Sequence, residues 1–360
     1  MTSRSSFTIE EARRNRISGD TRTGYASGIN QVIIWIKLVN KLHLLKQSAD
    51  GTTGESLDLS QFQYLDFLDF LVWTVRNKPT IKPGTLSGYR SAIKSLYGDE
   101  SLAVPVEFGD DMKEIFSGLR KTIAQGLQSG RLQDSGKRPL SWSTFERLCY
   151  DSMLLSDGGF THLFLIVTWN LMCRSQSTET ISFDHLSLEG DAIGVKFYKT
   201  KTKQEGTTVR DPRHCYANPS QPAACIFLAL GLYLSCNNQI VPSNLFPGSK
   251  QKDRFGKSLA RLLCGLDRQS GTGPIQKREI GTHSIRKGVA TFACSGTTGG
   301  PSIVSVCLRC GWSLGNVMER YFRYEAAGDQ FLGRVVAGLP VNSEEFAVLP
   351  PYFANNDDAT

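Results

Sequence analysis

Apolar side chains recur every three or four residues in four segments of the first third of the chain, the spacing of one helix face. The pattern predicts helices near residues 20–39, 60–75, 84–96 and 110–126. Asp20-Thr21 is expected to cap the first of them. Four amphipathic helices within about 105 residues are enough to form a small bundle with its own core.

The helical pattern continues through the second half of the chain with one interruption. Ile193, Val195 and Phe197 alternate with intervening residues that face the other way, as in a half-buried strand. A return strand is expected at 207–209, with the hairpin tip over 199–206. The segments with helical spacing lie near residues 144–155, 159–176, 222–234, 253–264, 281–294, 301–310, 315–324 and 327–337. The sequence therefore predicts an α+β protein, mainly α with a small antiparallel sheet.

A stretch rich in Gly, Ser and Gln separates the two helix-rich blocks and predicts a linker. A chain of 360 residues suits two domains. Ser143-Thr144-Phe145-Glu146 has the form of a capping box and is expected to begin the first helix of the second domain. We therefore expect a flexible arm over 1–19, a helical bundle over 20–126, a linker over 127–138, a second domain over 139–339 and a tail over 340–360.

The apolar content, the net charge and the cysteine pattern limit which classes of protein fit this chain. Apolar residues make up 40% of the chain, which is enough for globular folding, and the formal net charge is +7. This mild basic excess fits a nucleic-acid partner without requiring one. The nine cysteines follow no disulfide framework, and Cys307 and Cys310 lack a second pair at zinc-site spacing, so we expect free thiols and no metal. No apolar signal segment or membrane span is found, so we expect an intracellular protein.

Six side chains in the second block form a set suited to chemistry on a phosphodiester. Planar guanidinium groups match the non-bridging oxygens of a phosphate, where charge gathers during attack. A tyrosine hydroxyl can form a covalent intermediate. Each residue alone is more often structural, so the argument depends on joint order and spacing: a His and an Arg three apart, and a Tyr nine after a Trp. The set comprises Arg174, Lys201, His283, Arg286, Trp312 and Tyr321.

In these residues the chain resembles the tyrosine recombinases, the integrase superfamily, over roughly residues 20–335. The run 211–219 and the ending 333–340 look closest to eukaryotic Crypton-type transposon recombinases. The boxes that carry the likeness are Thr168-Trp169-Asn170-Leu171-Met172-Cys173-Arg174, Lys201 within 197–203, His283-Ser284-Ile285-Arg286, and Trp312 followed by Tyr321.

The resemblance implies an activity and a role for each residue. It implies site-specific breakage and rejoining of double-stranded DNA through a 3′-phosphotyrosyl bond to Tyr321, without a cofactor or a metal. It implies that the two arginines hold the phosphate, that Lys201 protonates the leaving 5′-oxygen, and that His283 and Trp312 assist. It further implies a bundle that clamps the duplex, a homo-tetramer on two duplexes and, for a eukaryotic recombinase, a place in the nucleus; otherwise the cytoplasm is expected.

Basic residues on the polar faces of the bundle and in the linker are candidates for contacts with DNA phosphates. Any one of them alone is more often a solvated surface residue. They are Arg22, Lys82, Arg90, Lys94, Arg120 and Lys121 in the bundle, and Arg131 and Arg138 in the linker.

Some details depart from the family or stay open. The acidic residue that many members carry three positions after the first arginine is Ser177 here, with Glu179 nearby, and the stretch 295–301 is longer than usual. A type IB topoisomerase uses the same kind of active-site residues, but the bundle ahead of the catalytic domain and Trp312 argue against this alternative. A domesticated DNA-binding or scaffolding protein is the other alternative, and the complete catalytic set argues against that. The general acid is one of three lysines, Lys199, Lys201 or Lys203, with Lys201 preferred.

Overall fold

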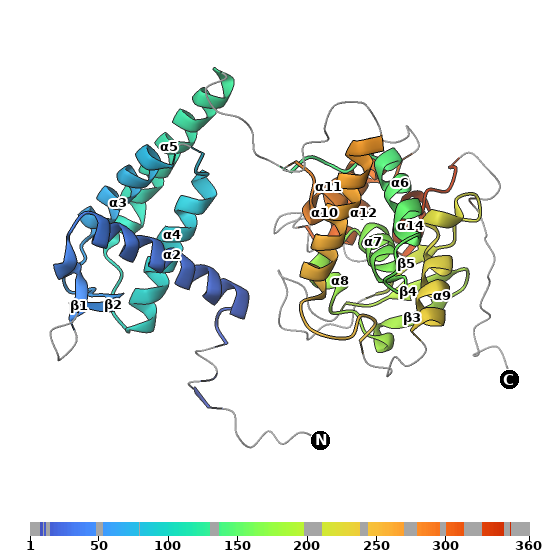
Figure 1. Cartoon of the computed structure of the whole chain (residues 1–360), viewed down its shortest axis with the longest axis horizontal. Coiled ribbons are helices and arrows are strands. Elements are labelled where there is room, and N and C mark those ends of the chain that lie inside the picture. The colour runs from blue at the N-terminus through green and yellow to red at the C-terminus, as the bar shows by residue number, and fades with distance from the viewer. Residues whose placement is uncertain are drawn as a thin grey trace. The chain divides into compact units, whose positions relative to one another are not determined.

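The chain divides into two compact units, Met1–Asp134 and Ser135–Thr360, and each is described by itself. Figure 1 shows their helices and strands. The computed structural model describes residues 15–47, 53–78, 80–129, 137–197, 211–237, 244–269, 279–295, 300–312 and 326–341, together with positions 8, 9, 11 and 346.

The first unit is a helical bundle with a small hairpin. Its strands β1 (Leu45–Gln47) and β2 (Thr53–Leu57) pair antiparallel, and short 3-10 turns occupy Leu42–Leu44 and Val106–Phe108. The helices are α2 (Gly19–Leu38), α3 (Tyr64–Asn77), α4 (Pro83–Asp99) and α5 (Asp110–Gln128).

Aromatic rings fill the core of this bundle. Phe67 and Phe70 lie three residues apart on α3, so both face inward, and Trp35 of α2 meets Phe70 edge to face at 5.7 Å between ring centroids. Helix α2 comes close to α4 at Gly28, where an added Cβ would lie 3.2 Å from the Cβ of Ala92. Close approach at a glycine thus sets how α2 packs on α4.

The four helices expected in this unit are confirmed, with changes at their starts. Ser18, two residues earlier than expected, caps α2, because its hydroxyl accepts the backbone N–H of Thr21 at 3.3 Å. Helix α3 begins at Tyr64, four residues later than expected, because Gln63 and Asp66 form a capping box in which the Asp66 carboxylate accepts the N–H of Gln63 at 3.0 Å. The hairpin has no counterpart in the sequence pattern, since its strands are too short to show alternation.

The second unit is built around one buried helix, α7 (Phe160–Asn170). Every residue of α7 is buried, and a helix that is apolar all round must be covered on all sides. Figure 1 shows α7 in the middle of the other elements. The helices that pack against it are α6 (Trp142–Met153), α9 (Ile226–Cys236), α10 (Gln251–Gln269), α11 (Thr282–Ser295) and α14 (Ala326–Val336).

A three-stranded antiparallel sheet lies beside these helices, in the order β3-β4-β5. Its strands are β3 (Leu186–Glu189), β4 (Ala192–Val195) and β5 (Arg213–Tyr216). In the central strand Ile193 pairs with Leu188 on one side and with Cys215 on the other. All four residues of β4 are buried rather than half of them, because both faces are covered: Ile193 and Val195 pack in the main core, and Ala192 packs against Tyr216 in a second cluster. The mainly α fold with a small antiparallel sheet is confirmed, and the return strand expected at 207–209 lies outside the described residues.

Two expected helix boundaries in this unit are wrong. The helix expected over 159–176 stops at Asn170, and Met172 adopts a left-handed backbone (φ 49°) before the short helix α8 (Ser175–Thr178) begins. The capping box expected at Ser143 is not formed: α6 begins two residues earlier than expected, and Ser141 accepts the N–H of Thr144 at 3.2 Å. Helix α12 (Ile303–Cys310) lies where expected, and the helix predicted over 315–324 lies outside the described residues.

The helix near the carboxyl end, α14, packs on its own unit. The indole N–H of Trp169 donates to the carbonyl of Val336 at 2.9 Å, and Arg334 pairs with Asp191 at 2.6 Å. Gly333 lies against the backbone of β5, where a Cβ would clash with the carbonyl of His214. Helix α14 is therefore seated on the sheet and on the central helix together.

The packing of α11 against the start of the second unit can be tested at Gly288. A Cβ there would overlap the backbone of Leu140, whereas a Cβ at Gly265 of α10 meets nothing within 4 Å. We expect Gly288→Ala to destabilise the unit by roughly 1–3 kcal/mol through overpacking. The control Gly265→Ala should leave stability unchanged or raise it by up to about 1 kcal/mol, because Ala favours a helix. Differential scanning calorimetry measures both, and equal Tm values would contradict this packing.

Candidate active site

The end of α7 positions the first arginine. Helix α7 stops at Asn170, the left-handed turn at Met172 redirects the chain, and Arg174 precedes α8 with an extended backbone (φ −79°, ψ 145°). Arg174 is half-buried. Burial, and then the nearby Arg286 guanidinium, lower its pKa, although it stays a cation at neutral pH. The structure therefore brings these two arginines of the predicted set together.

Helix α11 carries the His–Arg pair in its first turns. His283 is exposed, whereas Arg286, one turn on, is buried. Arg286 donates from Nη2 to the carbonyl of Cys310 at the end of α12. Its Nε is buried too and has no acceptor among the described residues. A buried N–H donor without an acceptor is costly, and in a cationic group it is a ready donor for an anion.

Trp312 is positioned by the end of α12. Ser302 caps the start of α12, and Gly311 ends it in the left-handed conformation (φ 64°), which glycine adopts without strain. The N–H of Trp312 then donates back to the carbonyl of Cys307 at 2.9 Å. Its ring lies 5.5 Å from the guanidinium carbon of Arg286, a cation–π distance. Trp312 is 41% exposed, so it covers one side of Arg286 and leaves a solvent-facing edge.

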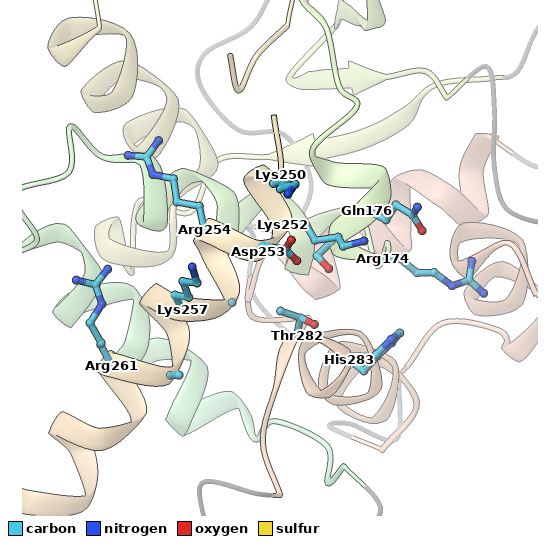
Figure 2. A pocket seen from close by; sticks show the side chains of 13 residues that line it. Arg174, Gln176, Lys250, Lys252, Asp253, Arg254, Lys257, Arg261, Thr282 and His283 are labelled. Carbon is cyan, nitrogen blue, oxygen red and sulfur yellow. The ribbon is translucent and has the colours of Figure 1, made fainter. Parts of the chain in front are cut away.

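A basic groove adjoins Arg174 and His283. It has a volume of about 910 Å³, and Asp253 is the carboxylate among its lining residues. In Figure 2, Arg254, Lys257 and Arg261 extend from α10, with Arg174 and His283 across from them. Six Lys and Arg side chains line the groove: Arg174, Lys250, Lys252, Arg254, Lys257 and Arg261. Such an excess of positive charge favours a polyanion.

The groove cations on α10 were not among the sequence candidates, although a signal exists. Arg254, Lys257 and Arg261 of α10 recur at spacings of three and four residues, which is one face of a helix, and Lys250 lies directly before the helix begins. Only the fold shows that this face lies beside Arg174. The backbone N–H of Lys252 at the start of α10 donates to Glu179 at 2.9 Å. Glu179, the acidic residue near the position that Ser177 occupies, thus anchors α10.

A further arginine, which was not among the sequence candidates, holds the turn that leads to Arg174. Arg213 of β5 donates to the carbonyl of Leu171 at 3.0 Å, and its guanidinium carbon lies 4.7 Å from the ring centroid of Phe197. Burial lowers the pKa of Arg213 to about 10. Arg213 thereby fixes the turn between α7 and Arg174.

The remaining sequence candidates are not brought to this site by the described residues. Lys201, Tyr321 and Arg131 lie outside the described part of the chain, as do Lys199 and Lys203. Arg138 pairs with Glu279 at 3.0 Å. In the first unit Arg90 lies 5.4 Å from the ring centroid of Phe116, and Arg120 donates to the carbonyl of Phe116 at 3.2 Å. The other candidates of that unit, all exposed, are Arg22, Lys82, Lys94 and Lys121.

The described residues were also compared with what a metal site and a membrane-spanning helix require. They contain no group of three or more His, Cys, Asp or Glu side chains that could hold a metal ion. None of their helices combines the length and the apolar character needed to cross a membrane.

Solved structures with a similar fold are recombinases and integrases. The Tn1549 transposon integrase in complex with circular-intermediate DNA is 11% identical, with 89% of this chain and 94% of that chain covered and a TM-score of 0.50. The XerH site-specific recombinase bound to difH substrate is 16% identical (74% and 69% covered, TM-score 0.44), and the Flpe–Holliday junction complex is 14% identical (75% and 76% covered, TM-score 0.41). No protein-family model and no curated protein matches the sequence. The fold of this chain is that of the Tn1549 transposon integrase.

Proposed function

We propose that this chain is a tyrosine recombinase that breaks and rejoins double-stranded DNA. The observation that carries the proposal is the proximity of Arg174, which lines the basic groove, to Arg286, whose Nε is buried and without an acceptor in the described part of the chain. A non-bridging phosphate oxygen supplies the acceptor, and two guanidinium groups stabilise the charge that develops there. His283 and Trp312 flank the same position.

In the proposed reaction the Tyr321 hydroxyl is the nucleophile. Its oxygen attacks the scissile phosphorus and gives its proton to His283, a phosphotyrosyl bond forms and the bond to the 5′-oxygen breaks. Lys201 gives its proton to that departing oxygen, and nearby cations favour this by lowering the pKa of a lysine. The covalent bond keeps the energy of the phosphodiester, so attack by a free 5′-hydroxyl reverses the step and reseals the strand.

The groove and the first unit together would hold the duplex. The α10 cations follow one another along a helix face and can contact successive phosphates of a bound strand. We also assign contacts with DNA phosphates to the exposed basic residues of the bundle, which are Arg22, Lys82, Lys94 and Lys121. A chain with two DNA-contacting units encloses the duplex as a clamp.

We propose further that the protein acts as a transposon-type recombinase of the Crypton kind, in the nucleus and as a tetramer on two duplexes. The run 211–219 and the ending 333–340 support the kind of recombinase, and the location and the tetramer follow from that resemblance. Relaxation of plasmid DNA by a monomer, independent of site, would instead favour a type IB topoisomerase. Binding to DNA without any covalent adduct would favour a domesticated scaffolding protein.

A suicide substrate that traps the cleaved strand tests the nucleophile. We expect the full chain to form a covalent adduct with DNA, and Tyr321→Phe to form none, because the attacking oxygen is lost. Non-covalent DNA binding by Tyr321→Phe, measured by gel shift, should stay within about twofold of the unchanged chain. The matched control is Tyr324→Phe, which should still form the adduct. Loss of the adduct in Tyr324→Phe alone would reassign the nucleophile.

The general acid is tested with a 5′-thio leaving group, which departs without a proton. Lys201→Ala should cleave the ordinary substrate at least about 100-fold more slowly and the thio substrate at nearly the rate of the unchanged chain. Lys199→Ala and Lys203→Ala serve as controls. Rescue confined to one of these two variants would move the role to that lysine.

The basic groove is tested by the salt dependence of DNA binding. Lys257→Ala with Arg261→Ala should weaken binding and reduce the slope of log affinity against log salt by about 2, because each phosphate contact contributes about 1. The control is Arg147→Ala on α6, whose side chain pairs with Asp151 at 3.0 Å instead of lining the groove. An unchanged slope in the α10 double variant would place the DNA elsewhere.

A further inference from the structure

A buried ion cluster lies behind the candidate active site. Arg309 of α12 pairs with Asp329 of α14 at 2.6 Å, and their side chains are 0% and 8% exposed. The second carboxylate oxygen of Asp329 accepts the backbone N–H of His214 at 2.8 Å and lies 2.9 Å from its Nδ1. Arg309 also donates to the carbonyls of Asn170 and His214, at 2.9 and 2.7 Å. Both charges are thus closely surrounded by partners.

The cluster joins the elements that hold the phosphate-binding arginines. Asn170 ends α7, four residues before Arg174. Arg309 is directly followed by Cys310, whose carbonyl accepts from Arg286. A displacement of Arg309 would therefore shift Arg174 and Arg286, because Asn170 lies four residues before Arg174 and Cys310 directly contacts Arg286.

The cluster also brackets the segment that carries the proposed nucleophile. Arg309 lies shortly before residues 313–325, and Asp329 lies shortly after them in the first turn of α14. Tyr321 is five residues from Ala326, where α14 begins, so the chain can carry it no more than roughly 17 Å from that point. An ion pair that closes the two ends of the segment limits where this tyrosine can go.

The chemistry of the cluster suits a positioning role better than simple stabilisation. A buried ion pair is often no more stabilising than well-packed apolar residues of the same volume, because both charges lose their water. Its bonds are directional, however, and fix the register of the joined elements. Burial would raise the pKa of Asp329, but Arg309 and the two His214 donors hold that pKa well below its usual range, so the carboxylate stays charged.

We propose that Asp329 is a positioning residue: through Arg309 and His214 it fixes both ends of the Tyr321 segment relative to Arg174 and Arg286. This inference rests on the proposed function. Asp329 touches neither DNA nor the reacting atoms in this role, and acts by setting where the nucleophile can lie. The same contacts keep α14 on its own unit.

The test compares two ion pairs that seat the same helix. Asp329→Asn keeps the volume and removes the charge at the start of α14, and the control Asp191→Asn does the same to the Arg334 pair at its end (2.6 Å). We expect Asp329→Asn to slow single-turnover adduct formation roughly tenfold or more, since a misplacement of about 1 Å can cost about 100-fold. DNA affinity should change by no more than about twofold, and Asp191→Asn should slow the adduct less than about threefold.

Asp329→Glu keeps the charge and is the second variant if Asp329→Asn fails to fold. It should form the adduct at a rate between those of Asp329→Asn and the unchanged chain. Hydrogen exchange on the DNA complex adds a readout that needs no chemistry: amides of residues 313–325 should exchange faster in the Asp329 variants and not in Asp191→Asn.

The outcomes separate this inference from the proposed function. Adduct formation by Asp329→Asn at the rate of the unchanged chain, or exchange over 313–325 equal to that of Asp191→Asn, would overturn the positioning role alone. A parallel loss of adduct and of DNA affinity would also overturn it, because that pattern indicates general unfolding. No adduct from the unchanged chain would overturn the proposed function, and the exchange comparison would still decide whether Asp329 anchors the segment.

Discussion

The burial of α7 is the constraint on which the second unit depends. A helix covered on every side has no exposed face for unpaired polar groups, so most of those on α7 find a partner nearby, and only His162 Nε2 and Asn170 Oδ1 have none among the described residues. Thr168 donates to the carbonyl of Phe164 at 2.7 Å, and the Asn170 amide donates to Ile166 at 3.0 Å. The indole N–H of Trp169 reaches α14. The end of this helix is consequently a rigid point, and the candidate site is assembled around it.

Positive charge gathers at that rigid point. Burial and the nearby Arg286 guanidinium both disfavour the charge of Arg174 and lower its pKa. Arg213 lies nearby and is itself held by the turn after α7. Such repulsion is tolerated in a protein when the anion that relieves it is part of the function. The packed core around α7 offsets the repulsion between these neighbouring arginines.

Local features of the site could be predicted from sequence, and distant ones could not. The apolar run before Arg174, the one-turn spacing of His283 and Arg286, and the glycine before Trp312 are all short-range patterns. Because helix geometry follows from spacing alone, these patterns placed α11, α12 and the start of α7 to within two residues, but they extended α7 six residues past its end at Asn170. The positions of Lys201 and Tyr321 stay predictions.

The ion cluster of Arg309, Asp329 and His214 is invisible in the sequence for a physical reason. Its members are separated by 20 and 115 residues along the chain, and no local periodicity links residues so far apart. The alignment of α10 with Arg174 depends in the same way on Glu179, 73 residues before the N–H that it accepts. The short hairpin of the first unit and strand β5 form because they cover hydrophobic cores. Intrinsic β-strand propensity does not predict such long-range packing.

The route by which the chain enters the second unit has a mechanical consequence. The backbone N–H of Arg138 donates to Glu279, that of Leu140 donates to Ser284, and the ammonium group of Lys287 donates to the carbonyl of Lys137. The entering segment 137–140 is thus tied to the start of α11, the helix of His283 and Arg286. Any tension that the connecting chain transmits is applied first to that helix. A pull on the chain that enters the second unit becomes a force on the end of α11 that carries His283 and Arg286 before it reaches the rest of the core.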